Sequence, residues 1–204
     1  MTQLPLIEQF GHIDIYLFDQ LLRGRVAPGM RVLDAGCGSG RNLVYLLRAG
    51  FDVWAVDREP AAVDVVRALA REHAPALPED RVRAAAVEAL PFADRSFDVV
   101  ISNAVLHFAR GHDHFEAMVG EMWRVLAPGG LLFARLASSI GMADRMQALG
   151  DGRHRLPDGS ERYLVDEAQL VRRGEALGGR LLDPIKTTVV QDQRCMTTWV
   201  LARP

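Results

Sequence analysis

Short apolar runs alternate along the chain with longer segments in which apolar residues recur every three or four positions. Runs of the first kind are typical of strands buried on both faces, and the longer spacing is typical of amphipathic helices. The predicted strands are residues 31–35, 52–56, 81–87, 97–102 and 131–136. The predicted helices between them are residues 41–48, 60–72 and 112–126. This alternation indicates an α/β fold with a parallel sheet that helices cover on both faces.

Residues 12–22 precede this pattern and have the apolar spacing of an amphipathic helix. Pro28 and Gly29 then interrupt the chain. We therefore expect residues 1–29 to form an N-terminal helical cap and residues 30–204 to form the main domain.

The last third of the chain departs from the alternation. Residues 138–163 are polar and contain several glycines, so we expect an insertion that forms a lid after the fifth strand. Residues 166–177 are predicted to be helical. Residues 181–190 and 196–202 are predicted strands, and their short connection requires an antiparallel C-terminal hairpin.

A glycine-rich turn follows the first predicted strand, with the sequence Asp34-Ala35-Gly36-Cys37-Gly38-Ser39-Gly40. Glycine permits positive φ angles and lets a ligand approach the backbone closely. In an open parallel sheet, ligands bind outside the carboxyl ends of the strands. The turn therefore predicts a ligand site at this edge of the sheet.

The acidic residues at the strand ends discriminate between ligands. A dinucleotide fingerprint requires glycine at the end of Gly-x-Gly-x-x-Gly, where this chain has Arg41. A pyrophosphate would be repelled by the Asp34 carboxylate, whereas a cationic amine would be attracted. Asp57 ends the second strand, where Rossmann-type sites bind the ribose diol. A ligand with a ribose, a cationic amine and no phosphate fits, and S-adenosylmethionine is such a ligand.

Three later segments extend this pattern: Glu88-Ala89-Leu90-Pro91-Phe92, residues 94–100, and residues 124–130 with the turn Pro128-Gly129-Gly130. With the glycine turn, they cover residues 31–136 and resemble the class I, Rossmann-like S-adenosylmethionine-dependent methyltransferases, of the methyltransferase-domain 11/25 type. The resemblance implies a three-layer α/β/α sandwich with a mostly parallel seven-stranded sheet that ends in the antiparallel hairpin. It also implies S-adenosyl-L-methionine as the cofactor.

The resemblance further implies which residues contact the cofactor. The expected cofactor-binding residues are Asp34, Gly36, Cys37, Gly38, Gly40, Asn42, Asp57, Arg58, Val87, Glu88, Ala89 and Asn103. Family members commonly carry an acid near the adenine amine, at the position of Ala86 in this chain. We expect Glu88, or the backbone of Val87 and Glu88, to take over that contact.

Candidates for the acceptor side follow the fourth strand and lie in the N-terminal helix. An unperturbed histidine titrates near neutrality, so His107 is the candidate catalytic base, with simple packing as the alternative. His12, Tyr16 and His107 are candidate substrate-binding residues.

Basic residues near the C-terminal hairpin supply further candidates. Arg153, in the cluster at residues 153–155, is a fourth candidate substrate-binding residue if the acceptor is acidic. The alternative is a solvated basic surface. Arg194, in the hairpin turn, has the same two interpretations.

Composition narrows the partners. The 204 residues carry a formal net charge of −2, without the basic excess that nucleic-acid binding favours. The two cysteines, Cys37 and Cys195, suggest neither a disulfide framework nor a metal site. No signal peptide and no apolar run of membrane-spanning length are visible in the sequence. We expect a cytoplasmic monomer or homodimer that acts on a small-molecule acceptor, with no metal and no nucleic-acid or membrane partner.

Two other functions stay open from the sequence. A non-catalytic S-adenosylmethionine-binding protein would keep the glycine turn but lack an accessible acceptor pocket. A nicotinamide-dependent Rossmann oxidoreductase would need a phosphate site, which Asp34 and Arg41 oppose.

Overall fold

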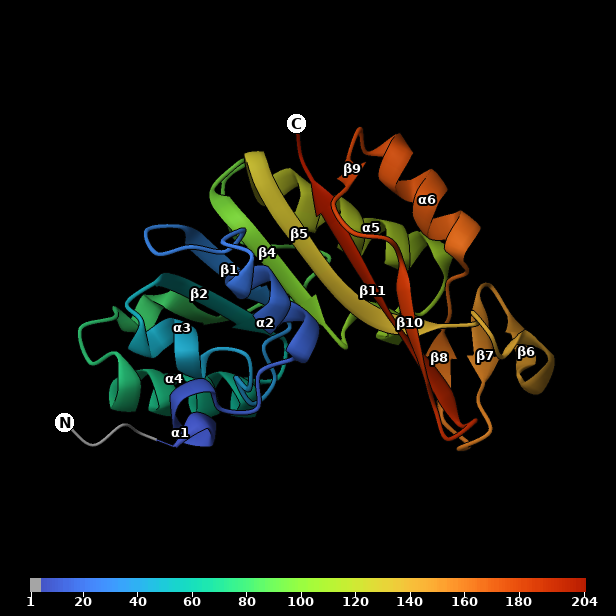
Figure 1. Cartoon of the computed structure of the whole chain (residues 1–204), viewed down its shortest axis with the longest axis horizontal. Helices are drawn as coiled ribbons and strands as arrows, with labels where there is room; N and C mark the ends of the chain where they lie inside the picture. Colours follow the sequence, from blue (N-terminus) through green and yellow to red (C-terminus); the bar gives the residue numbers. More distant parts are fainter. Residues whose placement is uncertain (1–4) are drawn as a thin grey trace.

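The central sheet has the strand order β10-β11-β5-β4-β1-β2-β3, and the short β9 (Arg180–Leu181) pairs with one end of β11 (Figure 1). This computed structural model describes residues 5–204. The parallel strands are β1 (Arg31–Ala35), β2 (Asp52–Asp57), β3 (Val82–Ala84), β4 (Phe97–Asn103) and β5 (Leu126–Ser138). β11 (Arg194–Ala202) lies antiparallel between β5 and β10 (Lys186–Val190). The predicted mostly parallel sheet with a C-terminal antiparallel hairpin is confirmed.

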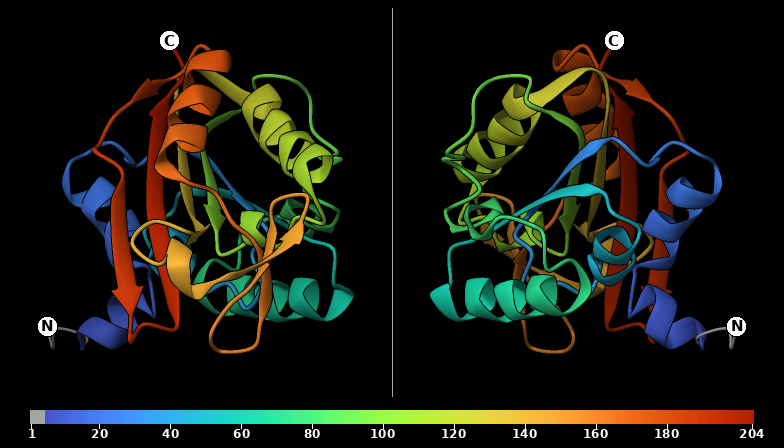
Figure 2. Two further views of the ribbon diagram at one scale, coloured as in Figure 1. Left: turned by 90° about the vertical axis from the view of Figure 1, so that its right-hand side faces the viewer. Right: turned by 90° about the vertical axis from the view of Figure 1, so that its left-hand side faces the viewer.

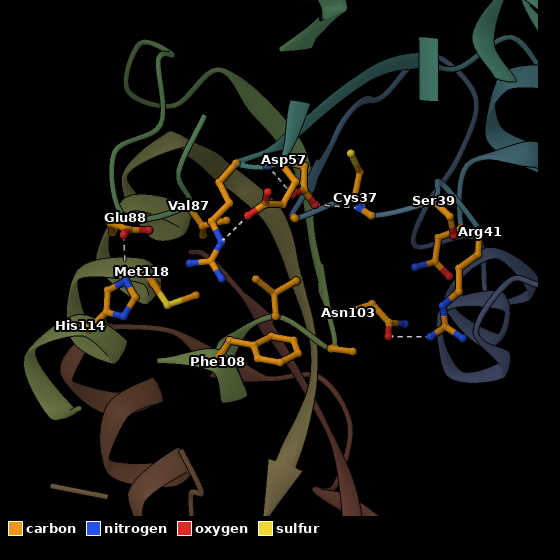
Figure 3. A pocket seen from close by; sticks show the side chains of 17 residues that line it. Cys37, Ser39, Arg41, Asp57, Val87, Glu88, Asn103, Phe108, His114 and Met118 are labelled. Carbon is orange, nitrogen blue, oxygen red and sulfur yellow. Dashed lines mark hydrogen bonds and ion pairs between the residues drawn. The ribbon is translucent and has the colours of Figure 1, made fainter. Parts of the chain in front are cut away.

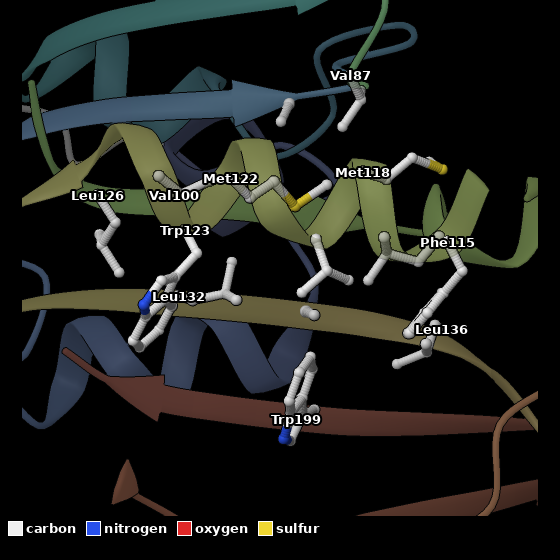
Figure 4. Packing of buried hydrophobic residues seen from close by; sticks show 14 of the residues in the cluster. Val87, Val100, Phe115, Met118, Met122, Trp123, Leu126, Leu132, Leu136 and Trp199 are labelled. Atoms are coloured by element: carbon white, nitrogen blue, oxygen red, sulfur yellow. The ribbon is translucent and has the colours of Figure 1, made fainter. Parts of the chain in front are cut away.

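Helices cover both faces of the sheet and complete the predicted three layers. One face carries α1 (Leu6–Phe10), α2 (Ile15–Leu22), α3 (Val44–Arg48) and α4 (Pro60–His73). The other face carries α5 (His112–Val125) and α6 (Glu167–Ala176). Met122 of α5, Leu132 of β5 and Trp199 of β11 lie together in the core on this second face (Figure 4). Burial on both faces explains why the predicted strands are almost continuously apolar.

Several element boundaries differ from the prediction. The helix expected at residues 12–22 begins at Ile15, because the Asp14 side chain accepts a hydrogen bond from the Tyr16 amide (2.9 Å) and caps the helix there. α1 is a separate short helix that the sequence pattern did not predict. The strand expected at residues 81–87 is shorter, because Glu79–Arg81 form a 3₁₀ turn and the chain leaves the sheet after Ala84. Residues 1–4 of the expected cap lie outside the described residues.

Residues 138–163 form a second sheet that the sequence pattern did not predict. Its strands β6 (Gln147–Gly150), β7 (Arg153–Arg155) and β8 (Glu161–Tyr163) are antiparallel. The Tyr163 ring stacks on Phe115 of α5 at 4.9 Å between centroids, and its hydroxyl lies 2.8 Å from His112 Nδ1. The small sheet is thereby anchored to the main domain, at the end where β10 turns into β11 (Figures 1 and 2).

Membrane-spanning helices are absent from residues 5–204, since none of the helices there combines the necessary length and apolar character.

Candidate functional site

A pocket of about 360 Å³ opens at the carboxyl ends of β1, β2 and β4 (Figure 3). Nine of the expected cofactor-binding residues line it: Gly36, Cys37, Gly38, Asn42, Asp57, Arg58, Val87, Glu88 and Asn103. Asp34, Gly40 and Ala89 do not line the pocket. Most of the residues that the sequence predicts to bind the cofactor therefore lie around a single cavity.

The glycine turn is tied to the neighbouring strand by its backbone. The amides of Gly36 and Cys37 both donate to the carbonyl oxygen of Val56, at 2.9 Å each. Gly36 has φ +88°, and a Cβ there would lie 2.5 Å from a methyl carbon of Val105. Gly38 has φ +51°, and a Cβ there would meet no described atom within 4 Å. The turn is therefore packed tightly at Gly36 and open at Gly38, where it borders the pocket.

Asp57 is held in one orientation at the end of β2. Its Oδ2 accepts a hydrogen bond from the Gly38 amide (2.9 Å), and its Oδ1 accepts one from the Glu59 amide (3.0 Å). Each carboxylate oxygen can accept more than one hydrogen bond. Asp57 therefore retains acceptor capacity on a pocket wall.

Asp34 lies within the sheet, beside Ala55 of β2 and Ile101 of β4, and is only 1% exposed. Its Oδ1 has no hydrogen-bond partner among the described residues. Burial raises the pKa of Asp34 to about 7; the Arg41 guanidinium opposes this shift, and the Asp57 carboxylate adds to it. A nearby cation stabilises the ionised form of a buried carboxylate such as that of Asp34.

Asn103 ends β4 and faces the glycine turn. Its Oδ1 accepts a hydrogen bond from Arg41 Nη2 (2.7 Å), while its buried Nδ2 has no partner within residues 5–204 (Figure 3). The amide therefore presents an unused hydrogen-bond donor.

Glu88 places a carboxylate on the opposite wall of the pocket. It is the residue expected to replace the family's acid at the position of Ala86. Its Oε1 lies 2.9 Å from His114 Nε2 and 3.6 Å from an Arg110 nitrogen (Figure 3). Partial burial raises the pKa of Glu88, but hydrogen bonds from its own amide and from His114 outweigh burial and keep the pKa below its ordinary value. His114 was not a candidate site residue from the sequence, because its contact with Glu88 depends on how α5 packs.

Cys37 lines the pocket as a small residue of the turn. Burial raises the pKa of its thiol, and Asp34 and Asp57 raise it further. A thiol with a raised pKa is a poor nucleophile, so Cys37 is not placed to react covalently with a ligand. Groups of three or more His, Cys, Asp or Glu side chains that could hold a metal ion are absent from residues 5–204.

A second pocket of about 380 Å³ adjoins the first, because Arg41 and Ala104 line both. It lies between the carboxyl end of β5, the turn from β7 to β8 and the turn from β10 to β11. Its charged side chains are Asp14, Arg41, Arg135, Asp158, Arg162 and Arg194. Three arginines, Arg135, Arg162 and Arg194, line this pocket and not the first. Of these, only Arg194 was a candidate from the sequence.

His107 lies in the second pocket and is 6% exposed. Burial, together with the guanidinium groups of Arg162 and Arg194, lowers the pKa of His107 to about 4. Its Nδ1 accepts a hydrogen bond from the Ala137 amide (3.1 Å), so the neutral ring carries its proton on Nε2. This arrangement supplies a hydrogen-bond donor and does not favour the general-base role.

The other candidate substrate residues lie outside both pockets. His12 is exposed. The Tyr16 hydroxyl lies 3.1 Å from Thr188 Oγ1, and the Arg135 guanidinium stacks over the Tyr16 ring at 4.7 Å. Arg153 pairs with Glu161 at 2.8 Å on the small sheet. Tyr16 therefore supports a pocket arginine, while the charge of Arg153 is already compensated.

Residues 33–134, half of the chain, match the family described as a methyltransferase domain. The uncharacterized methyltransferase YodH of Bacillus subtilis is 31% identical over 132 residues, covering 63% of this chain and 54% of YodH. The malonyl-[acyl-carrier protein] O-methyltransferase of Pectobacterium atrosepticum is 36% identical over 110 residues, covering 53% of this chain and 40% of that protein. The chain thus spans about half the length of the curated relatives it matches, or less.

The fold is also similar to solved structures. One is the Burkholderia thailandensis 1,6-didemethyltoxoflavin-N1-methyltransferase with bound 1,6-didemethyltoxoflavin and S-adenosylhomocysteine. It superposes with a TM-score of 0.67 at 22% identity, covering 92% of this chain and 76% of that one. Together with the family match, this similarity shows that the chain belongs to the methyltransferase-domain family, the class I, Rossmann-like S-adenosylmethionine-dependent methyltransferases.

Proposed function

We propose that this chain binds S-adenosylmethionine in the first pocket and transfers its methyl group to a small-molecule acceptor in the second. The observation that carries this proposal is the pair of carboxylates Asp34 and Asp57 at adjacent strand ends, beside the open glycine turn. Their combined charge suits a cationic nucleoside and disfavours a pyrophosphate.

The residues present fit this cofactor. Asp57 would accept hydrogen bonds from the ribose hydroxyls, and Glu88 would accept one from the adenine amine. The unused Asn103 donor would bind the carboxylate of the methionyl group, and Asp34 would favour its ammonium. When bound, the cofactor supplies a methyl group that its sulfonium makes electrophilic.

The protein's own contribution to the transfer is chiefly orientation. Holding two reactants in the correct geometry can supply roughly 7–11 kcal/mol of the barrier. The Nε2–H of His107 would donate a hydrogen bond to the acceptor and fix its position. His107 would act as a positioning residue, and the acceptor would present an atom that already carries a free lone pair.

The segments outside the central domain fit a cap and a lid. Asp14 and Tyr16 hold Arg135 from the N-terminal side, as expected of a cap at residues 1–29. Leu156 and Ser160, from the insertion at 138–163, line the second pocket, as expected of an acceptor lid. The adjoining second pocket favours an enzyme over a non-catalytic binding protein, and Asp34 disfavours a nicotinamide cofactor.

Thermal unfolding with added S-adenosylmethionine or S-adenosylhomocysteine tests the cofactor site. At about 100 times its dissociation constant, either ligand should stabilise the protein by roughly 2.7 kcal/mol. Asp57→Ala should abolish this shift by removing the ribose acceptor, and Gly38→Val should abolish it by filling the open side of the turn. Asp52→Ala, at the opposite end of β2, is the matched control and should keep the shift.

Unchanged ligand shifts in both site variants would refute the proposed cofactor site. Stabilisation by NAD would instead support the oxidoreductase alternative. Transfer of a labelled methyl group from S-adenosylmethionine into a small-molecule cell extract tests catalysis, and cofactor binding without any transfer would favour the non-catalytic alternative.

A further inference from the structure

We infer that the second pocket recognises an anionic group of the acceptor, a carboxylate or a phosphate, through the unpaired Arg162 and Arg194, with Arg135 lining the same pocket. This inference rests on the proposed function, since it names the class of acceptor for the same site. The three arginines come from β5, β8 and the first residue of β11. They meet because β11 runs antiparallel beside β5 and the small sheet folds back over that end.

Arg162 and Arg194 have no carboxylate partner within 4.0 Å in the part of the chain that the structure describes. Arg162 donates one hydrogen bond to the Glu161 carbonyl (2.7 Å) and stacks over Phe108 at 4.9 Å from the ring centroid. Stacking fixes the plane of the guanidinium but leaves most of its donors unused. By contrast, Arg153 and Arg155 on the same small sheet both pair with Glu161, at 2.8 and 2.9 Å.

The two aspartates of the pocket offset only part of this charge. Asp14 is engaged by Arg135 at 3.1 Å and caps α2 through the Tyr16 amide. Asp158 accepts hydrogen bonds from the Ser160 amide (2.9 Å) and hydroxyl (2.6 Å). Four arginines therefore face two engaged carboxylates, and the excess positive charge also helps to lower the pKa of His107.

Unpaired guanidinium groups in a pocket match carboxylates and phosphates, because their planar donors form two parallel hydrogen bonds to either anion. Arg162 and Arg194 line the second pocket and not the first. Their removal should therefore weaken acceptor binding and leave cofactor binding intact. His107 adds a neutral donor on the same wall.

The test compares anion binding by the wild type and by the double variant Arg162→Gln/Arg194→Gln, both saturated with S-adenosylhomocysteine. Succinate and inorganic phosphate are the anionic probes, succinamide is the neutral probe, and sodium chloride fixes the ionic strength. At least one anion should bind the wild type about tenfold or more tightly than the double variant, since charge-assisted hydrogen bonds are lost. The control Arg153→Gln/Arg155→Gln should bind that anion as the wild type does.

Equal binding of both anions by the wild type and the double variant would overturn the inference, and so would equally tight binding of succinamide. The S-adenosylhomocysteine shift, measured first on every variant, reports correct folding and tests the proposed function separately. If S-adenosylhomocysteine does not stabilise the wild type, the proposed cofactor site is refuted. If it stabilises the wild type but neither anion binds selectively, only the anionic acceptor is refuted.

A second arm uses the natural acceptor pool. A small-molecule cell extract is separated by anion exchange, and each fraction is tested for labelled methyl transfer. Acceptor activity should elute with the anions and should fall about tenfold or more with the double variant. Phosphatase treatment that abolishes the activity assigns a phosphate, and resistance assigns a carboxylate. Acceptor activity confined to the neutral or cationic fractions would overturn the inference.

Discussion

Asp34 and Asp57 lie at the carboxyl ends of neighbouring strands, β1 and β2, but have different surroundings. Each oxygen of Asp57 accepts a backbone hydrogen bond, whereas Asp34 is buried and its Oδ1 lacks a donor within residues 5–204. The sequence alone could place both residues at the carboxyl edge, because parallel strands end at the same edge of a sheet. It could not show which carboxylate is satisfied, since that depends on the fold of the glycine turn.

The raised pKa of Asp34 predicts a pH-dependent stability of the ligand-free protein. Between its ordinary pKa of 3.8 and its folded pKa of about 7, folded Asp34 retains a proton that the unfolded chain releases. The free energy of unfolding should therefore fall, on the order of a few kcal/mol, as pH rises through this range, and Asp34 should contribute no further change above it. Urea unfolding from pH 4 to 8 measures this slope, and Asp34→Asn should flatten it.

The same proton should oppose cofactor binding. A cationic ligand favours the ionised carboxylate, so the affinity for S-adenosylmethionine should weaken by up to about tenfold per pH unit below pH 7. An Asp34→Asn protein with the wild-type pH slope in both measurements would contradict this account.

At the scale of elements, the buried side chain of Asp183 contacts α2 from the segment that precedes the C-terminal hairpin. Asp183, between β9 and β10, is 8% exposed and accepts hydrogen bonds from Gln20 and Arg25, at 2.9 Å each. Burial raises the pKa of Asp183, but these hydrogen bonds and the arginine charges outweigh it and keep the pKa below its ordinary value. The contribution of Asp183 to stability is therefore present at neutral pH and is lost only as pH falls below 3.8.

Asp183→Ala should lower the free energy of unfolding by about 2–3 kcal/mol at pH 7, because it leaves Gln20 and Arg25 without their acceptor. Denaturant unfolding monitored by circular dichroism measures the change. Asp64→Ala is the matched control, since the exposed Asp64 pairs with Arg67 and its loss should change stability by less than about 1 kcal/mol. Similar losses in the two variants would show that α2 is not held by this contact.

The elements that the sequence predicted well are those with a strong local pattern. β1 and β4 are nearly all buried, and β2 is half buried without an exposed residue, so their apolar runs were sufficient. The small sheet could not be predicted, because β6, β7 and β8 are short and only Tyr163 among them is buried. The second pocket was missed for the same reason: Arg135 and Arg162 come to line one cavity only after that sheet folds back.

At the scale of the molecule, one sheet separates two large hydrophobic clusters. Leu33 and Val100 belong to one cluster, and Val32 and Val99 belong to the other. Residues adjacent in sequence therefore support opposite layers, and neither layer can lose its packing without exposing the sheet. This arrangement favours one cooperative unit.

We therefore predict a single unfolding transition in denaturant. Fluorescence of Trp54, Trp123 and Trp199, which all pack in one hydrophobic cluster, and far-ultraviolet circular dichroism should give the same midpoint. S-adenosylhomocysteine should raise both midpoints together. A separate early transition would show that the small sheet β6–β8 unfolds independently of the central sheet.

β11 lies inside the sheet although it is translated after the strands on both sides of it, β5 and β10. A nascent chain translated only to residue 193 therefore lacks the strand that joins β5 to β10, as well as Trp199 beneath α5 and α6. Until the ribosome has released residue 202, β5 presents an unpaired apolar edge of the kind that chaperones shield and that aggregates recruit. The native sheet can close only after β11 has been translated.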